Sequence, residues 1–489
     1  MRSRYIVVVG ILVGLSASAQ NNTPAPRWWS KYQTLLQNGI GPGGKKTSSI
    51  SAGGNADASD ECGPQSETFI TLNTMKPQSV AAGSNEIFRL AMRGYASSDG
   101  GTSWTGTDLP LPPAIGKNGI DFGSDPSLAF DTQGNLYYSY IVVYFSNGNG
   151  INGTALSVAK STDGGKTYPG ANVFSFSSGS DHFNDKPMIA ADTNLLSPYR
   201  DNVYLAWDAA SGGSSGGGIR FARSTDQGAA FSVARIDDPK GPGRVIAAQP
   251  FVGPNGEVYV AWNDYAANKI TLNRSFDGGA TFGTPVTVAS KSIPFDIGIP
   301  AISFRRALIY PACDADRSTG AHRGRLYCSW ADLSNGVNTD IYVSYSDDRG
   351  ATWSAPRSVT DKLTNVDRFY QWLSVDAQTG EVNISFYDTR NDTTGLRYMT
   401  DVYFTRSSDG SSFAPNVRVS SASSNEHDCS GVFPCSAIDY GNQYGDYEGL
   451  VSFGGVSHAV WTDSRNQMKP STGCRTNLLM EEVFSATIQ

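Results

Sequence analysis

A short sequence recurs six times along the chain, and this repeat limits the possible folds more than any other feature. The copies are SSDGGTSW (97–104), STDGGKTY (161–168), STDQGAAF (224–231), SFDGGATF (275–282), SDDRGATW (346–353) and the shorter SSDGSSF (407–413). Successive copies lie roughly 50 to 70 residues apart, which is close to the period of propeller blades with their loops. In each copy the Asp can accept hydrogen bonds from the turn's own amides, and the Gly permits a positive φ. We therefore predict that each octapeptide is a hairpin turn.

Each octapeptide lies inside a longer repeating unit of alternating, strand-type sequence. Around the fourth copy, ITLNRS precedes the turn and PVTVAS follows it, while VYVAWND (258–264) and QPFVGPNG (249–256) lie upstream. The unit is thus strand a, turn, strand b, loop, strand c, octapeptide, strand d. Four antiparallel strands repeated around an axis form a β-propeller. The sequence therefore predicts an all-β fold.

The number of units predicts the number of blades. Seven units are found, with strand a starting near Glu67, Asp125, Asp185, Gln249, Pro300, Tyr370 and Asp446. The seventh unit has no octapeptide and ends in NLLMEEVFSATI (477–488), so a strand from the N-terminal region is expected to complete it. Six blades is the alternative, if the first or last unit is only an extra hairpin.

The composition argues against some classes of function. Charged residues make up 17% of the 489 residues and the net charge is −7, so a generic nucleic-acid-binding surface is not expected. The chain has four histidines and no clustered Cys/His spacing, so we expect no metal site and no required cofactor.

The N-terminal sequence MRSRYIVVVGILVGLSASAQ has the pattern of a secretory signal. Two arginines precede an apolar run from Tyr5 to Leu15, and Ala-Ser-Ala stands before Gln20. We expect cleavage near Ala19/Gln20, a secreted or periplasmic location, and no membrane association afterwards. A single membrane anchor is the alternative, but the apolar run is short of the about 20 residues that span a bilayer.

Export makes the six cysteines informative, because an even number in an exported protein indicates disulfides. Cys313–Cys328 and Cys429–Cys435 are close in sequence and would each close a loop. This leaves Cys62–Cys474, a bond that would join the two ends of the fold. Six cysteines allow many other pairings, so these three remain expectations.

The octapeptides closely resemble the Asp-box, S-x-D-x-G-x-T-W, of the bacterial neuraminidase repeat. The resemblance covers the chain from about residue 66 and implies a propeller over 66–489, after a signal peptide over 1–19 and a linker segment over 20–65. Asp-boxes occur in sialidases, other glycoside hydrolases, sugar-binding propellers and sorting receptors. In such folds they lie in the c–d turns, opposite the active site. The repeated aspartates are therefore expected to be structural: Asp99, Asp163, Asp226, Asp277, Asp348 and Asp409.

The opposite face is where we expect chemistry, because the starts of strand a and the ends of strand b converge there around the axis. The polar candidates on this face are Asp125, Asp185, Gln371 and Asp446 at strand a starts, Asp388, Arg390, Asp463 and Arg465 at strand b ends, and Arg305 in the fifth unit. Several carboxylates with several arginines suit a negatively charged sugar, since arginine binds a carboxylate in a two-point fork.

Tyr447, in YGDYEGLVSF (444–453), is the candidate nucleophile. Its position is similar to that of the nucleophilic Tyr of sialidases, which lies on the innermost strand of the last blade. A Tyr nucleophile keeps an enzyme carboxylate away from the substrate's own carboxylate. We expect Asp446 or another nearby acid to activate it, and Asp125, with Asp185 as the rival, to act as acid/base. The structural alternatives are an ordinary aromatic at the axis and aspartates that cap strand ends.

Arg390 and Arg465, with Arg305 as a third, are the candidates for clamping a substrate carboxylate. Asp388, Asp463 and Gln371 are further substrate-binding candidates. Alternatively, the Asp and Arg of YDTRND and of WTDSRN pair within their own loops. The F/Y-R-I-P motif of sialidases has no counterpart in the chain, and FRLA (88–91) is the nearest string.

The sequence thus favours an exported, monomeric glycoside hydrolase of sialidase-like architecture that cleaves a terminal, acidic sugar from a glycan. A non-catalytic propeller that binds glycan or protein on the same face is the second hypothesis. A polysaccharide lyase on the same scaffold is the third. The polar residues of that face differ from unit to unit, which favours one asymmetric site over repeated sugar pockets.

Overall fold

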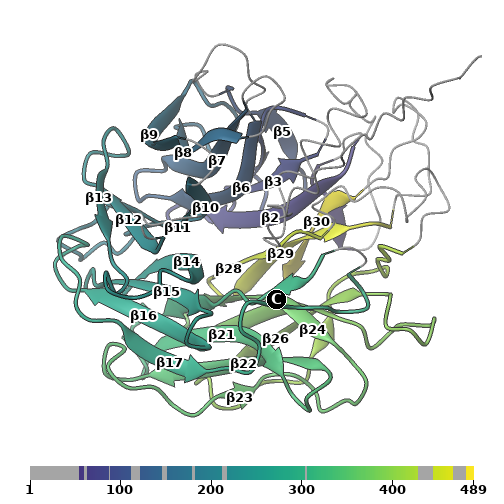
Figure 1. Cartoon of the computed structure of the whole chain (residues 1–489). Coiled ribbons are helices and arrows are strands. Elements are labelled where there is room, and N and C mark those ends of the chain that lie inside the picture. Colours follow the sequence, from purple (N-terminus) through teal and green to yellow (C-terminus); the bar gives the residue numbers. More distant parts are fainter. Residues whose placement is uncertain are drawn as a thin grey trace, which may run out of the picture.

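Seven four-stranded antiparallel sheets surround a common axis in the computed structural model (Figure 1). The structure describes residues 54–59, 63–87, 89–111, 122–145, 151–178, 182–211, 217–302, 305–427, 444–465 and 481–489. Within these ranges the chain contains strands and no helix, so it has no helix that could cross a membrane. The prediction of an all-β propeller with seven blades is confirmed, and the six-bladed alternative is wrong.

The strands fall into four concentric sets. The innermost strands are β2 (Gln65–Leu72), β6 (Phe122–Phe130), β10 (His182–Ala191), β14 (Val245–Val252), β20 (Ala312–Ala315), β24 (Arg368–Val375) and β28 (Gly449–Phe453). The second strands are β3 (Val80–Glu86), β7 (Leu136–Phe145), β11 (Val203–Ser211), β15 (Val258–Asp264), β21 (Leu326–Leu333), β25 (Val382–Asp388) and β29 (Val456–Asp463). The third strands are β4 (Arg93–Ser97), β8 (Ile151–Ser161), β12 (Ile219–Ser224), β16 (Lys269–Ser275), β22 (Thr339–Ser346), β26 (Asp401–Ser407) and β30 (Glu482–Ile488). The outer strands are β5 (Thr105–Asp108), β9 (Ala171–Ser178), β13 (Ser232–Arg235), β17 (Val286–Ser290), β23 (Arg357–Ser358), β27 (Val417–Arg418) and β1 (Asn55–Asp57).

The ring closes by pairing the two ends of the described chain. β1 lies antiparallel to β30, with Asn55 opposite Ala486 and Asp57 opposite Phe484. Figure 1 shows the C-terminal yellow strands beside the purple N-terminal ones. The expected completion of the seventh blade by an N-terminal strand is therefore confirmed. The propeller thus uses residues that precede β2.

Every octapeptide forms the turn between the third and outer strands of a blade. In the fourth blade the Asp277 carboxylate accepts hydrogen bonds from Ser275 Oγ (2.7 Å), Thr281 N (2.9 Å) and Thr281 Oγ1 (2.6 Å). The same bonding recurs around Asp99, Asp163 and Asp348. These carboxylates stabilise the turns from within, as expected from turn chemistry.

The glycines of these turns pack against the preceding blade. The Cβ that an alanine would add meets Tyr137 at Gly228 (3.1 Å), Phe221 at Gly279 (2.8 Å), Leu272 at Gly350 (2.7 Å) and Tyr327 at Gly410 (2.3 Å). A side chain at these positions would push neighbouring blades apart. The octapeptide is therefore both a turn and a contact between blades.

Gly279→Ala is expected to lower the free energy of unfolding by about 1–3 kcal/mol more than Gly101→Ala does. Both glycines have a positive φ, +81° and +82°, so backbone strain is matched. Only at Gly279 does the new methyl overlap a neighbouring ring, because at Gly101 the nearest atom is 3.4 Å away. Urea unfolding of both variants measures the difference, and equal losses would show that the contact between blades is unimportant.

The fifth blade departs from the expected pattern. Its innermost strand is β20 and begins at Ala312, so the expected start near Pro300 is wrong. The apolar residues around Pro300 instead lie in the loop of a short hairpin, β18 (Asp296–Ile297) with β19 (Ala307–Leu308). That extra hairpin displaces the blade's first strand along the sequence.

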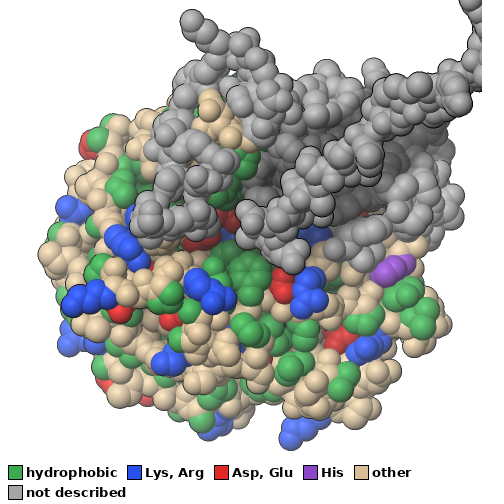
Figure 2. Space-filling view, in the orientation of Figure 1, with side chains coloured by type: hydrophobic (Ala, Val, Ile, Leu, Met, Phe, Trp, Pro, Cys, Tyr) green, Lys and Arg blue, Asp and Glu red, His purple; other side chains and the backbone are tan. Residues whose placement is uncertain are grey.

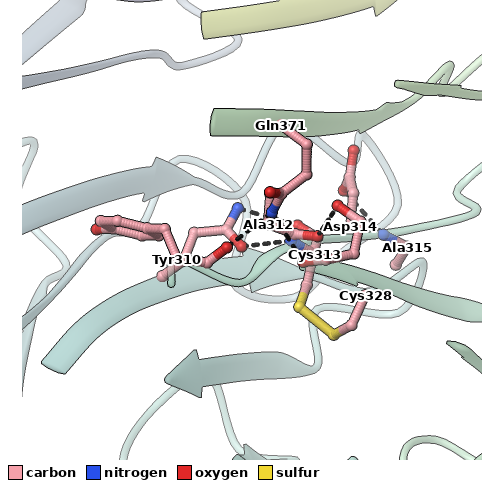
Figure 3. Close-up of a disulfide and its surroundings, with 9 residues drawn as sticks. Tyr310, Ala312, Cys313, Asp314, Ala315, Cys328 and Gln371 are labelled. Atoms are coloured by element: carbon pink, nitrogen blue, oxygen red, sulfur yellow. Dashed lines mark hydrogen bonds between the residues drawn. A yellow bond between two sulfur atoms is a disulfide. The ribbon is translucent and has the colours of Figure 1, made fainter. Parts of the chain in front are cut away.

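A disulfide and two glutamines hold this short strand in place (Figure 3). Cys313 and Cys328 are directly opposite each other on β20 and β21 and form the expected bond. Gln249, from the fourth blade, accepts from Cys313 N (2.6 Å) and donates to Cys313 O (2.9 Å). Gln371, from the sixth blade, donates to Tyr310 O (2.7 Å) and Ser329 O (3.2 Å). The contacts of Gln371 are therefore with backbone of the neighbouring blade.

Some expectations lie outside the described residues. These are the signal sequence with its cleavage site, and the four remaining cysteines, Cys62, Cys429, Cys435 and Cys474. On the part of the surface that the structure describes in Figure 2, Lys and Arg side chains are interspersed with Asp and Glu. No large patch of one sign is visible there.

Candidate functional site

Five innermost strands carry a bulge at the same height. The pairing register shifts between Ser66 and Phe69 in β2, and at the equivalent places in β6, β10, β14 and β24. One residue in each bulge has a positive φ: Glu67 (52°), Asp125 (59°), Lys186 (54°), Ala247 (62°) and Tyr370 (48°). Non-glycine residues seldom adopt this conformation, which costs about 1–3 kcal/mol each and is concentrated at functional sites.

Three of these bulge residues are charged, and they meet two further charges at the axis. We call Glu67, Asp125, Lys186, Arg305 and Asp446 the axial cluster. Lys186 Nζ lies 2.6 Å from Asp446 Oδ2, 3.9 Å from Asp125 Oδ2 and 4.0 Å from Glu67 Oε1. Arg305 lies 3.3 Å from Asp446 Oδ2 and 3.6 Å from Glu67 Oε1. Because these residues come from blades one, two, three and seven and from the segment before blade five, the contacts span the axis.

The axial cluster is buried and holds more acids than bases. None of its five members is more than 7% exposed. Two cations face three carboxyl groups within the cluster, and Asp185 and Asp208 of the third blade lie beside it and interact with Lys186. Burying unpaired charge costs several kcal/mol, so such a site retains protons on some of its carboxyls.

Asp125 is the carboxylate that stays ionised. Burial alone would raise its pKa, but the charge of Lys186 and hydrogen bonds from Asp185, Glu67 and Ser124 hold the pKa well below its usual range. Burial raises the pKa of Glu67 to about 7, although Lys186 opposes that rise. Burial likewise raises the pKa of Asp185 well above its usual range. In their protonated forms Glu67 and Asp185 act as donors to the Asp125 carboxylate, and Glu67 begins to lose its proton near neutral pH.

The Asn85 side chain fixes the orientation of this carboxyl pair. Its Nδ2 donates to Glu67 Oε2 (2.9 Å), and its Oδ1 accepts from Asp125 N (2.7 Å) and Ser124 Oγ (3.2 Å). Asn85 lies on β3, one strand outward, and is fully buried. The Asn85 side chain on β3 therefore positions Glu67 of the first blade and Asp125 of the second.

Tyr447 lies beside the axial cluster and is almost completely buried. Its hydroxyl donates to Pro126 O (2.9 Å), and Lys186 Nζ lies 5.9 Å from its ring centroid. Its ring contacts Tyr310 edge-on, with centroids 5.6 Å apart. Burial and then the nearby Glu67 and Asp125 carboxyls raise the pKa of Tyr447 well above its usual range. Tyr447 is therefore a neutral phenol in this arrangement.

Arg390 and Arg465 do not contact the axial cluster in the described part of the structure. Arg390 pairs with Asp388 and Asp361, both at 2.7 Å, and its guanidinium lies 4.0 Å from the centroid of Tyr403. Arg465 pairs with Asp463 at 2.7 Å and lies 4.2 Å from the centroid of Phe484. Both arginines therefore make the same within-loop pair and the same stacking contact in adjacent blades, as in the structural alternative.

The structure thus brings together Asp125, Asp185, Asp446, Arg305 and Tyr447 out of the predicted residues. It leaves Asp388 and Asp463 at the ends of β25 and β29, paired with Arg390 and Arg465, and Gln371 in contact with the fifth blade. Lys186 and Glu67 mark strand starts in the sequence, but no role was predicted for them. A charged residue directly before proline, as in Asp125-Pro126 and Lys186-Pro187, is the signal that could have found the bulge.

Stability is expected to fall as pH rises from about 5 to 8. Burial raises the pKa of Glu67 to about 7, of Asp208 to about 7 and of Glu448 to about 8. A carboxyl whose pKa is higher in the folded than in the unfolded protein contributes fully to the free energy of unfolding at pH values below its unfolded-state pKa. This contribution is lost as the pH rises through the folded-state pKa. Each such group removes about 1.4 kcal/mol per pH unit within that window.

Urea unfolding at several pH values measures this slope. The turn carboxylates serve as an internal reference: the pKa of Asp277 is lowered to about 2, so its contribution is constant above pH 5. A free energy of unfolding that stays level or increases between pH 5.5 and 8 would contradict the protonated state that we assign to the buried acids.

Among the described residues no group of three or more His, Cys, Asp or Glu side chains is arranged to hold a metal ion. The site is instead a network of carboxyls, one lysine and one arginine. No protein-family model and no curated protein matches the chain by sequence.

Solved structures with a similar fold include several sialidases. A Hadza microbial sialidase, Hz136, aligns with a TM-score of 0.47 and 14% identity over 67% of this chain, and the match spans 63% of that protein. The leech intramolecular trans-sialidase aligns with a TM-score of 0.46 and 13% identity, over 77% of this chain and 72% of its own. The intramolecular trans-sialidase from Ruminococcus gnavus aligns with a TM-score of 0.45 and 12% identity, over 72% and 94%. At these identities the similarity concerns the fold alone.

Proposed function

We propose that the protein is a glycoside hydrolase of sialidase-like architecture that removes a terminal acidic sugar from a glycan. The axial cluster carries this proposal. It is one asymmetric set of buried acids and bases at the end of the innermost strands opposite the octapeptide turns, which we interpret as Asp-boxes. Structural ion pairs seldom require three strained, charged bulge residues at one height.

Lys186 and Arg305 are the proposed binding groups for the sugar carboxylate. Both already contact the Asp446 carboxylate, at 2.6 Å and 3.3 Å. Asp446 therefore occupies a position where an anion is stabilised by two cations from different blades. A substrate carboxylate would share or take over these contacts, with the guanidinium offering a two-point fork.

Glu67 is the proposed general acid, because its pKa of about 7 lies near the working pH, where about half of the molecules carry the proton. Asp125, which stays ionised, is the proposed base for the Tyr447 hydroxyl. In the reaction the Tyr447 oxygen bonds to the anomeric carbon, the glycosidic bond breaks, and the Glu67 proton goes to the leaving oxygen. The Tyr447 proton passes to Asp125. Water then bonds to the anomeric carbon as the bond to the Tyr447 oxygen breaks, a water proton passes to Glu67, and Asp125 returns its proton to Tyr447. A neutral phenol nucleophile avoids repulsion between two carboxylates.

A non-catalytic propeller that binds a glycan at this face is the second candidate. It is favoured by the contacts of both cations with protein carboxylates, which give the axial cluster internal stability without any substrate. Such a cluster would organise the axis while sugar contacts form around it.

We also propose that the protein is exported, to the periplasm or beyond the cell. The N-terminal sequence supports this location, and the Cys313–Cys328 disulfide is typical of an oxidising compartment.

A hydrolysis screen with fluorogenic glycosides tests the proposal. The panel contains sialic acid, related nonulosonic acids, uronic acids and neutral sugars, and the Tyr447→Phe variant is assayed in parallel. Release of an acidic sugar that is lost in Tyr447→Phe supports both the activity and the nucleophile. Sugar release that is unaffected by the substitution contradicts the role of Tyr447. If no glycoside in the panel is hydrolysed but the protein binds to a glycan array, the binding propeller is favoured.

A further inference from the structure

Three junctions between neighbouring blades at the octapeptide face share one kind of contact. In blades two, three and four, a tyrosine on the second strand lies opposite a long cation on the third strand. These cross-strand pairs are Tyr137 with Lys160, Tyr204 with Arg223, and Tyr259 with Arg274. Together they fill the space between one blade and the octapeptide turn of the next.

The lysine or arginine of each pair also donates a hydrogen bond to the octapeptide turn of the next blade. Lys160 Nζ donates to Gln227 Oε1 (3.1 Å), Arg223 donates to Gly278 O (3.4 Å) and Arg274 donates to Arg349 O (3.0 Å). Each acceptor belongs to the octapeptide of the next blade. The junctions after blades two, three and four are therefore closed by a ring and a long side chain.

The other blades lack this pair. Ala81 lies opposite Ala96 in blade one, Tyr327 opposite Tyr345 in blade five, and Asn383 opposite Arg406 in blade six. The junction between blades seven and one has a further arrangement. The equivalent cross-strand pair is His458 with Thr487, and both side chains are shorter than the tyrosine and cation they replace. Thr487 Oγ1 still donates to Gly100 O (3.1 Å), so the junction is formed but underfilled. A Cβ added at Gly101 would come no closer than 3.4 Å to any neighbour, whereas it meets atoms at 2.3 to 3.1 Å at the other four turns measured above.

A cavity of about 470 Å³ occupies this junction. Its volume lies within the range of about 300–1,000 Å³ that is usual for ligand pockets. Its wall includes the amide side chains of Gln78 and Gln378, the hydroxyls of Thr102 and Thr487, and the ring of Phe453. No lysine or arginine lines it, and burial lowers the pKa of the lining His458 to about 4, so that ring is neutral.

We propose that this cavity is a binding site for one neutral pyranose unit of a glycan. A sugar ring has apolar C–H faces and a rim of hydroxyls that both donate and accept. Phe453 supplies an apolar surface, while the amides and hydroxyls around it supply donors and acceptors for that rim. The lack of cationic lining residues disfavours an acidic sugar, which distinguishes this site from the axial cluster.

The site lies among the octapeptide and a–b turns, at the opposite end of the blades from the axial cluster. A glycan held there would anchor the protein without blocking the axis. The inference does not depend on the proposed hydrolase activity, since sugar binding in this cavity needs no catalytic group.

Calorimetric titration of the full chain with glucose, galactose, mannose and N-acetylglucosamine tests the proposal. At least one sugar is expected to bind with a dissociation constant of about 1–10 mM, which is typical of a single small polar ligand. The double variant His458→Tyr/Thr487→Arg rebuilds the pair found in blades three and four. It is expected to weaken that binding at least about ten-fold by filling the cavity, with an unchanged or higher Tm.

Surface variants keep the test independent of folding. Gln378→Ala removes an exposed amide from the wall and is expected to weaken binding about three-fold or more. Gln227→Ala, on the same face but at another junction, and Glu67→Gln, at the axial cluster, are expected to bind unchanged. Absence of saturable binding by any of these sugars below about 50 mM, or unchanged binding by the double variant, would overturn the proposal.

Discussion

Glu67→Gln is expected to lower kcat towards an acidic glycoside by about 10²–10⁴-fold, the usual contribution of a positioned general acid. The glutamine keeps the size of the side chain and its hydrogen bond with Asn85, but it has no proton to give to the leaving oxygen. In the wild-type protein the proposed hydrolysis should slow as pH rises through about 7, because the pKa of Glu67 is raised to about that value by burial. That falling limb should be absent from the profile of the variant.

Stopped assays across pH 5 to 9, at a temperature well below the unfolding transition, provide the measurement. Glu86→Gln is a matched control, because Glu86 is also fully buried in the first blade but bonds to Tyr95, Ser84 and Gln65 instead of the axial cluster. The control should keep its rate and its pH profile. A Glu67→Gln variant with nearly full activity would show that another group protonates the leaving oxygen.

Lys186→Met is expected to lower the free energy of unfolding by about 3–5 kcal/mol at pH 7. Lys186 is 4% exposed and lies within 4.0 Å of carboxylate oxygens of Glu67, Asp125 and Asp446. Methionine has a similar length but no charge, so it leaves the ionised acids buried without one of the two cations of the axial cluster. The loss should be smaller at pH 5, where more of these carboxyls are protonated.

Lys291→Met is the matched control for the burial of a lysine. Lys291 is 7% exposed, and its Nζ donates to the backbone carbonyls of Ile293 (2.7 Å) and Pro294 (2.5 Å). Its removal should cost about 1–3 kcal/mol, because two carbonyls lose a donor and the longer-range attraction to Asp332 and Asp264 is lost. In addition, Asp446→Asn should recover part of the loss in the Lys186→Met background, and purely additive effects of the two substitutions would contradict their coupling.

The seven blades were predictable because their signals are local. A period-2 pattern defines each strand, and the Asp and Gly of the octapeptide determine each turn within a few residues. The disulfide was likewise predictable from the short separation of its cysteines, since Cys313 and Cys328 lie on consecutive strands. The fifth blade was placed too early because the hairpin β18–β19 inserts an apolar segment before its first strand.

The site was less predictable because it depends on bulges. A bulge interrupts the alternation of side chains, so the sequence alone does not say whether Asp185 or Lys186 faces the axis. The structure places both there, with Lys186 as the central cation. Arg390 and Arg465 were predicted to bind a substrate carboxylate because arginine pairs well with carboxylates. In the structure each arginine instead pairs with the Asp two residues before it.

The bulge residues with positive φ lower the stability of the fold. Glu67, Asp125 and Lys186 all adopt a conformation that favours glycine, and all three are charged and buried. A propeller selected only for stability would place apolar residues at such positions, as Ala247 does in the fourth blade. The choice of charged residues in the first three blades is the main physical argument for a function at the axis.

The most direct test of this account compares one acidic glycoside with its methyl ester. The two substrates differ in the charge that Lys186 and Arg305 are proposed to bind and in one methyl group, and the protein is unchanged. We predict that kcat/KM for the acid exceeds that for the ester by about 10–150-fold, the contribution of hydrogen bonds to a charged group. Equal kcat/KM values for the two substrates would contradict recognition of an acidic sugar at the axial cluster.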